Sequence, residues 1–506
     1  MAWDALSRRV TKVLDPAMSL FVNRHELGFA GYPAARRGLP RALDGANDTA
    51  VYTAGAAAAV VLATLIAFAG PKLALLAMVV LTLLGIMALR PAVAAYLMIA
   101  ITPLVAGIDR GTVMPVLRPN EALMLLAIVA LCGRAILRLN VSSRPQLRFQ
   151  RLDVAIMLLA VTSSIIPLAW LGLRGLKVES DDVLYSLMIW KYYAVFLIFR
   201  STIRSSARAR ICLWLCMASA ALVAVIAVLQ SLGSPGVEAF LGRFYAPYGD
   251  VSAVSNNRGG STLSLPIAVA DLMAFNLAIA IGLLKSSRVR WPLIALMSLF
   301  AIGIFASGQF SGVIALVVAV CAIVVTTGRI RYLAVFPASF VVAVVALRPV
   351  INKRLEGFQS PSGLPVSWQG RLDNLQNYFL PELFSHAHWV LGVRPAARVA
   401  TEKIATGYIW IESGYLWLLW AGGIPLLLSF FYFLWAGARE ALAVLRARAD
   451  APAAAALAVI VALSVVGVLM TIDSHLTYRG SADLLFALLG ITAAARTMPS
   501  NEPRTG

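Results

Sequence analysis

The sequence predicts an all-α polytopic membrane protein with about 14 transmembrane helices and one large extracytoplasmic loop. Of its 506 residues, 60% are hydrophobic and only 13% are charged, which is more apolar surface than a soluble domain can bury but suits a bilayer. The apolar runs are continuous over helix length, whereas the strands of a membrane β-barrel alternate in short segments. The third observation is where the positive charge lies.

The net charge of +19 would raise nucleic-acid binding as a function in a soluble protein. Here the Lys and Arg residues fall mainly in short loops between apolar runs, as the positive-inside bias of membrane proteins requires. We therefore expect the lipid bilayer, and no nucleic acid, as a partner. If every run spans, the basic loops share the side of the N-terminus, and both termini are cytoplasmic. These loops carry Arg134 to Arg151, Arg200 to Arg210, Lys285 to Arg290, Arg329 and Arg331, and Arg439 to Arg448.

The chain divides along its length into five segments. Residues 1–50 are a basic cytoplasmic segment, in which about 17–29 has the character of an interfacial amphipathic helix. A transmembrane bundle (51–349), the large external loop (350–407), C-terminal transmembrane helices (408–496) and a cytoplasmic tail (497–506) follow. We predict spans at about 51–70, 72–89, 92–108, 120–138, 153–173, 184–199, 211–231, 264–284, 292–307, 309–327, 332–349, 408–436, 453–471 and 483–495.

The four cysteines all lie within apolar runs. Because they form no pattern of metal-ligand clusters, we interpret them as small core residues. We expect neither a metal ion nor another cofactor.

Two long segments lie on the predicted external face, at about 232–262 and 350–407. Long irregular segments in compact proteins are usually functional or disordered, and the second is too rich in aromatic residues for disorder. Within it, Arg371 to Tyr378 has the spacing of an amphipathic helix, with Leu372, Leu375 and Phe379 on one side. Arg371 then lies on the other face, free to point into a cavity.

Arg258 stands in the motif Asn-Asn-Arg-Gly-Gly-Ser at the end of the first external segment. Glycines allow a backbone to approach a ligand closely, and a guanidinium can hold a phosphate by paired hydrogen bonds. Ser261 would open a helix whose N-terminus favours an anion. The alternative is an arginine that only extends to the lipid headgroups.

Glu412 lies near the external start of a span, among Trp410, Tyr415 and Trp417. An aromatic belt accounts for these aromatic residues, but a carboxylate at a membrane is expensive and tends to be functional. Apolar surroundings raise a carboxyl pKa toward the range of a general base. The alternative is an exposed interfacial glutamate.

Several other polar residues fall in or beside the spans. Lys191 is expected to pair with a carboxylate inside the bundle, and Asp271 is one candidate. His475, with Asp473 and Arg479, lies on the external side, where these residues can line a cavity wall.

These features resemble the O-antigen ligase and O-antigen polymerase superfamily of bacterial integral-membrane glycosyltransferases. The resemblance covers roughly residues 120–495 and rests on four places. They are Arg258-Gly259-Gly260-Ser261 leading to Pro266; Gly370-Arg371; Leu391-Gly392-Val393; and Glu412-Ser413-Gly414-Tyr415-Leu416 with Gly422-Gly423-Ile424-Pro425.

The resemblance implies a GT-C-like architecture in the bacterial cytoplasmic (inner) membrane and a metal-independent transfer from an undecaprenyl-diphosphate-linked oligosaccharide to an acceptor glycan. Arg258 and Arg371 would bind the diphosphate, and Glu412 would take the proton of the acceptor hydroxyl. Other membrane proteins of polysaccharide assembly would be further partners. The remaining residues expected to bind substrate are Arg243, Asn374, Arg394, Ser413, Tyr415, His475 and Arg479.

Two departures from the family favour a polymerase over a ligase. Ligases often carry a His-Asn pair where this chain has Glu412-Ser413, and Phe310 replaces the arginine of a family hairpin motif. A ligase remains the second expectation. A lipid-linked oligosaccharide flippase is a third, although no repeated halves of the kind common in transporters are visible, and a scaffold of an envelope complex is a fourth.

Overall fold

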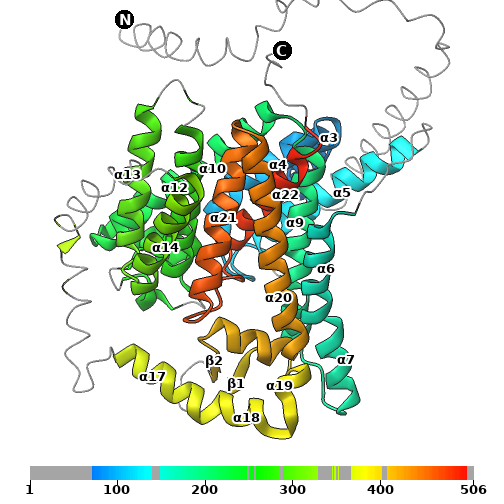
Figure 1. Ribbon diagram of the computed structural model, residues 1–506, viewed down its shortest axis with the longest axis vertical. Helices are drawn as coiled ribbons and strands as arrows, with labels where there is room; N and C mark the ends of the chain where they lie inside the picture. Colours follow the sequence, from blue (N-terminus) through cyan, green and yellow to red (C-terminus); the bar gives the residue numbers. More distant parts are fainter. Residues whose placement is uncertain are drawn as a thin grey trace, which may run out of the picture. The chain divides into compact units, whose positions relative to one another are not determined.

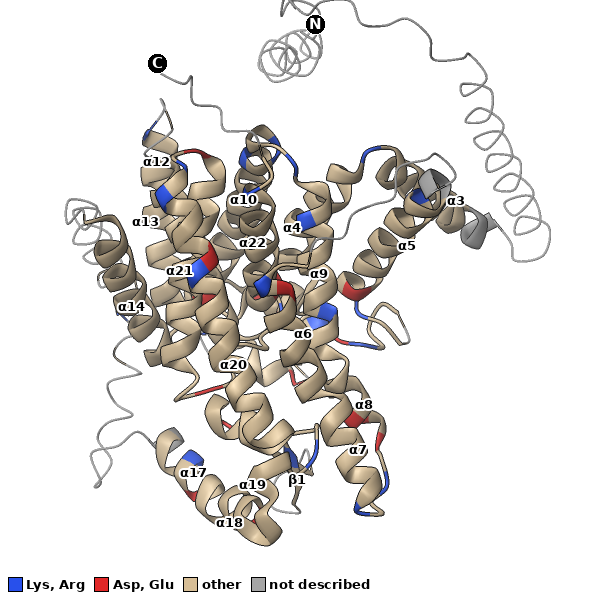
Figure 2. Cartoon of the chain, turned by 45° about the vertical axis from the view of Figure 1, so that its right-hand side comes forward, with Lys and Arg blue, Asp and Glu red and all other residues tan. Residues whose placement is uncertain are grey.

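The computed structural model describes residues 71–498 except 115, 140–148, 248–249, 256–257, 285–286, 288–289, 329–344, 346, 349–351, 353–365 and 402–406. The described chain is predominantly a bundle of apolar helices, and most of their length carries no charged residue (Figure 2). The helices before the large loop are α3 (Pro71–Leu89), α4 (Pro91–Val105), α5 (Pro119–Leu139), α6 (Arg151–Ser163), α7 (Ile165–Leu173), α8 (Ser180–Ser186), α9 (Met188–Thr202), α10 (Ser206–Ser231), α11 (Pro235–Phe244), α12 (Pro266–Leu284), α13 (Trp291–Ala306) and α14 (Phe310–Thr327), with 3-10 turns η2 (Val251–Ala253) and η3 (Ser261–Leu263).

The large loop and the last helices complete the chain. The loop contains α17 (Val366–Asn374), a π-helical turn η5 (Leu375–Phe379), α18 (Leu380–Phe384), η6 (Ser385–Ala387), α19 (His388–Leu391), β1 (Arg398–Ala400) and β2 (Tyr408–Trp410). It is followed by α20 (Gly414–Ala447), α21 (Ala451–Leu469) and α22 (Ser481–Ala495). Figure 1 shows the loop elements gathered at the end of the bundle where α20 begins and α21 finishes, here called the loop end.

The prediction of a polytopic helical membrane protein is confirmed at this level. Eight described helical segments are long and apolar enough to cross a membrane, counting α6 with α7 and α8 with α9, and four shorter apolar helices accompany them. Each of these twelve segments corresponds to one of the spans predicted between 72 and 495. The predicted span at 332–349 has no counterpart among them. That span falls almost wholly outside the described residues, and the predicted span 51–70, the segment 1–50 and the tail from 499 fall wholly outside them.

Both bounds of one predicted span were wrong, and two predicted spans are interrupted. The span placed at 408–436 begins only at Gly414, because Tyr408–Trp410 form a strand. The helix also continues beyond the predicted end, to Ala447. This strand pairs with β1 in antiparallel register, with Val399 opposite Ile409. The spans predicted at 153–173 and 184–199 each consist of two helices, broken at Ser164 and Leu187.

The core of the bundle lies along α12 and α21, where nearly every residue is buried. In a membrane the hydrophobic effect contributes little to helix association, because lipid tails are as apolar as the side chains. Close packing therefore matters more, and small side chains allow it. A Cβ added to Gly282 would lie 2.7 Å from Ala454 Cα on α21. Likewise, a Cβ on Gly490 would lie 2.6 Å from the Phe196 carbonyl oxygen on α9.

The large loop docks on α20 at a kink. Gly423 has φ 65°, a conformation that favours glycine, and Pro425 follows it within α20. The Val393 N–H donates to the Trp420 carbonyl oxygen at 2.7 Å, and a Cβ on Gly392 would lie 2.9 Å from Gly422 N. The glycine pair of α20 and the Leu391-Gly392-Val393 motif therefore meet at this kink, and both need glycine because the two backbones approach so closely.

A second attachment of the loop is ionic. Asp182 of α8 is fully buried and accepts hydrogen bonds from Arg394 Nη2 at 2.7 Å and from the Ala396 N–H at 3.2 Å. Arg398 pairs with Asp181 at 2.6 Å and with Glu179 at 3.3 Å. These contacts hold the strand pair against the start of α8.

Candidate active site

An arginine and two acidic side chains from three separate elements meet at the loop end. Arg371 of α17 places Nε 2.8 Å from Glu412 Oε2 and Nη2 3.7 Å from Asp473 Oδ2. Glu412 lies between β2 and α20, and Asp473 lies between α21 and α22. We call these three residues the Arg371 cluster.

The backbone around Glu412 is fixed on both sides. Before it, the Ile411 N–H donates to the Ala397 carbonyl oxygen at 3.2 Å. After it, the Tyr415 N–H donates to the Met470 carbonyl oxygen at 3.0 Å. Gly414 packs so closely that an added Cβ would lie 2.7 Å from the Asp473 carbonyl oxygen. The start of α20 is thus held against the end of α21, which brings the two carboxyl groups to the same arginine.

The amphipathic helix predicted around Arg371 is present, but its buried face differs from the prediction. Phe379 is buried, and its ring lies 5.2 Å from that of Trp420 in an edge-on contact. Leu372, expected on the same packed side, is 49% exposed. The π-helical turn after Asn374 adds a residue to the helical turn and shifts the packed face, so the regular helical spacing no longer applies.

Arg258 lies within electrostatic reach of the cluster. Burial lowers the pKa of Arg258, and the positive charge of Arg371 lowers it further. Its turn is locked in place, because the Gly259 N–H donates to the Ala306 carbonyl oxygen at 2.9 Å. A Cβ at Gly259 would lie 2.8 Å from the Ala227 carbonyl oxygen. The Arg258 side chain is therefore close enough to Arg371 for the two charges to interact.

The pKa of the Glu412 carboxyl is raised above its ordinary value. Burial is the largest cause, Arg371 opposes it, and the charge of Asp473 adds to the rise. The Glu412 side chain keeps 40% of its surface exposed, so a small molecule can reach the carboxyl group. A reachable carboxyl with a raised pKa, paired with Arg371, has the properties of a general base.

A buried pair lies directly behind the cluster. His475 Nδ1 is 2.8 Å from Asp271 Oδ2, and both side chains are fully buried. Asp473 also hydrogen-bonds Tyr478, whose ring makes an edge-on contact with that of His475. His475 was predicted to line the cavity wall, but its burial makes it a support of the loop that carries Asp473.

Several other predicted residues have partners that hold the fold. Arg394 is bound to Asp182, and Arg479 pairs with Asp109 at 2.9 Å. The Tyr415 hydroxyl donates to the Gly467 carbonyl oxygen at 2.6 Å. Ser413 is buried at the start of α20.

The remaining predictions have varied outcomes. Asn374 lies in α17, half-buried and three residues after Arg371. Arg243 lies on α11 beside a separate cavity. Ser261 is buried, where its hydroxyl donates to the Val223 carbonyl oxygen at 2.9 Å, so it is a structural residue of the turn. Lys191 pairs with Asp483 at 3.7 Å and not with the suggested Asp271.

Asp473 is the residue of the cluster whose role was not predicted. Its carboxyl group shares Arg371 with Glu412, whereas the sequence indicated only that it could line a cavity wall with His475 and Arg479. Across the described ranges, no three His, Cys, Asp or Glu side chains are grouped as a metal site would need. No known family model, curated protein or solved structure matches the chain.

Proposed function

We propose that the protein is a membrane glycosyltransferase that polymerises lipid-diphosphate-linked oligosaccharide repeat units on the outer face of the bacterial cytoplasmic membrane. The supporting observation is the Arg371 cluster, in which a reachable carboxyl group is paired with a guanidinium at 2.8 Å. A second arginine, Arg258, lies within electrostatic reach of Arg371. The apolar helical bundle is the expected setting for a donor carried on a polyprenyl chain.

The leaving group of this reaction is a lipid diphosphate. It departs with its negative charge and needs cations rather than a proton donor. Arg258 and Arg371 would bind its oxygens and stabilise the charge that develops as the sugar–phosphate bond breaks.

The acceptor hydroxyl oxygen attacks the anomeric carbon, a new glycosidic bond forms, and the bond to the diphosphate breaks. Glu412 would receive the hydroxyl proton. The product is a lengthened glycan on one lipid carrier and a free lipid diphosphate.

The ion pair suggests how donor binding prepares the base. With no donor bound, Arg371 holds Glu412 and lowers its basicity. A diphosphate that draws Arg371 away from Glu412 would remove the stabilisation of the Glu412 carboxylate. The charge of Asp473 would still raise the pKa of Glu412. Glu412 would then become a stronger base only when the donor is in place.

A product assay with purified protein tests the proposal. We expect a synthetic undecaprenyl-diphosphate oligosaccharide to yield a ladder of lipid-linked products. Arg371→Gln should abolish the ladder, whereas Arg446→Gln, a substitution of an exposed arginine at the other end of α20, should not.

Transfer only to a second, lipid A-type acceptor would indicate a ligase instead. Leaflet exchange with no new glycosidic bond would refute the enzyme and indicate a flippase.

A further inference from the structure

A separate cavity of about 400 Å³ lies between the α4–α5 connection and α11. Three arginines line it, namely Arg110 and Arg118 from the connection and Arg243 from α11. This volume falls within the range of small-molecule sites, roughly 300–1,000 Å³. We call it the Arg118 cavity; none of the Arg371 cluster lines it.

Positive charge is in excess around the Arg118 cavity. Glu121 pairs with Arg110 at 2.8 Å, and Asp109 pairs with Arg479 at 2.9 Å. Arg118 lies farther from these carboxylates, at 3.5 Å from Asp109 and 3.7 Å from Glu121. With Arg243 included, four guanidinium groups thus face two carboxylates.

Two of these arginines have donors to spare. Arg118 Nε is buried and has no hydrogen-bond partner among the described residues. Burial and the charges of Arg479 and Arg110 lower the pKa of Arg118, while Glu121 and Asp109 oppose this. Arg243 is exposed and forms no ion pair within the described chain; its guanidinium lies 5.2 Å from the ring of Phe244. An anion in the cavity would satisfy both.

We propose that the Arg118 cavity binds the phosphate group of a membrane lipid headgroup. Three guanidinium groups from two elements converge on it, and a tetrahedral phosphate offers oxygens in several directions. A carboxylate presents two oxygens in one plane, which a single guanidinium can satisfy.

The lipid source follows from the apolar side chains beside the cavity. Val113 and Val116, in the same connection as Arg110 and Arg118, are 57% and 74% exposed. Phe240, one turn before Arg243 on α11, is 48% exposed. Apolar residues next to arginines at the end of a membrane bundle suit the boundary between acyl chains and headgroups. A free phosphate would gain nothing from them.

Lipid titration followed by native mass spectrometry tests this proposal on the full-length protein. The probes are phosphatidylglycerol, its phosphate-free counterpart diacylglycerol, and inorganic phosphate as competitor. Arg243→Gln is the informative variant, because an exposed arginine without an ion pair can be replaced without unfolding the protein. Arg446→Gln is the matched control. We expect Arg243→Gln to weaken the tightest phosphatidylglycerol binding about tenfold, as loss of a charge-assisted hydrogen bond predicts.

Each outcome decides the matter. The proposal would be overturned if Arg243→Gln and Arg446→Gln bound phosphatidylglycerol with equal affinity. It would also be overturned if diacylglycerol bound as tightly as phosphatidylglycerol. Displacement of phosphatidylglycerol by an equimolar amount of inorganic phosphate would show a free-phosphate site and overturn the lipid assignment. Arg371→Gln should retain wild-type lipid affinity, so failure of the transferase proposal is distinguishable from failure of this one.

Discussion

At the scale of single residues, the environment gives two neighbouring carboxyl groups different properties. Glu412 and Asp473 lie 2.8 and 3.7 Å from the same arginine, and burial together with the charge of Asp473 raises the pKa of the Glu412 carboxyl. Two carboxyl groups near one cation cannot both be equally well compensated. The Glu412 side chain is 40% exposed and that of Asp473 only 12%, so Glu412 is the carboxyl group that an acceptor can reach.

The pH dependence of transfer follows from the raised pKa of Glu412. A raised pKa keeps Glu412 protonated to higher pH, so the base form should appear later as pH rises. The acid limb of the rate profile should therefore lie above the ordinary glutamate value. Asp473→Asn removes a charge that raises the Glu412 pKa, so it should move the limb to lower pH. A pH–rate profile of both proteins checks this, and a limb that stays in place or moves upward would contradict it.

At the scale of helices and strands, sequence reasoning succeeds for long apolar elements and fails for short or distant ones. Apolar runs of about 20 residues specify helices almost alone, so α10, α12 and α21 lie close to their predicted bounds. The strands β1 and β2 have three residues each, too few for an alternating pattern to be recognised. Asp182 and Arg394 meet across 212 positions, and no local pattern reveals such a partner.

The ionic attachment of the loop gives a stability prediction. Asp182→Ala leaves Arg394 and the Ala396 N–H without their acceptor. We expect a loss of roughly 2 kcal/mol in unfolding free energy, the range of a hydrogen bond to a charged group. Thermal unfolding in detergent and protease cleavage within 385–401 measure it. The control is Asp373→Ala, an exposed acid of the same loop for which no ion pair is seen in the described residues. Equal effects of the two substitutions would show that the ion pairs do not hold the loop.

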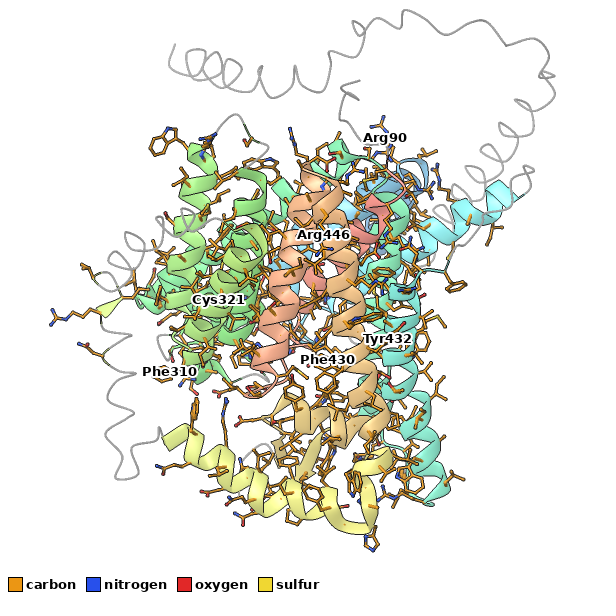
Figure 3. The ribbon with its side chains drawn as sticks, in the orientation of Figure 1. Arg90, Phe310, Cys321, Phe430, Tyr432 and Arg446 are labelled. Atoms are coloured by element: carbon orange, nitrogen blue, oxygen red, sulfur yellow. The ribbon has the colours of Figure 1, made fainter. Side chains whose placement is uncertain are left out.

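At the scale of the whole molecule, the sequence predicted that the candidate groups would gather at one end, and ion pairs join Arg371 to Glu412 and Asp473 there. Arg371, Glu412 and Asp473 lie at the loop end, and Arg479 links the α21–α22 connection to Asp109 of the α4–α5 connection there. Figure 3 places Arg90 at the opposite end of the bundle, and Arg446 lies in the last turn of α20, away from the start of that helix at the loop end. The sequence did not show that Arg394 and His475 would be used internally, since that depends on packing.

The orientation of the molecule in the membrane is testable by cysteine labelling. Starting from a variant without Cys132, Cys212, Cys216 and Cys321, single cysteines are introduced at Ser385 or Thr112, and at Arg90 or Arg446. If the loop end faces outward, an impermeant maleimide should label the first pair in intact cells and the second pair only after lysis. The reverse pattern would place the loop in the cytoplasm and remove the site from its proposed substrate.

The most direct test of the central claim is the initial rate of lipid-linked product formation by Glu412→Gln, at equal amounts of inserted protein, with Glu382→Gln as the loop control. Loss of a general base predicts a fall of about 10²- to 10⁴-fold for Glu412→Gln and a near-normal rate for Glu382→Gln. A Glu412→Gln enzyme that lengthens glycans at the wild-type rate would contradict the account.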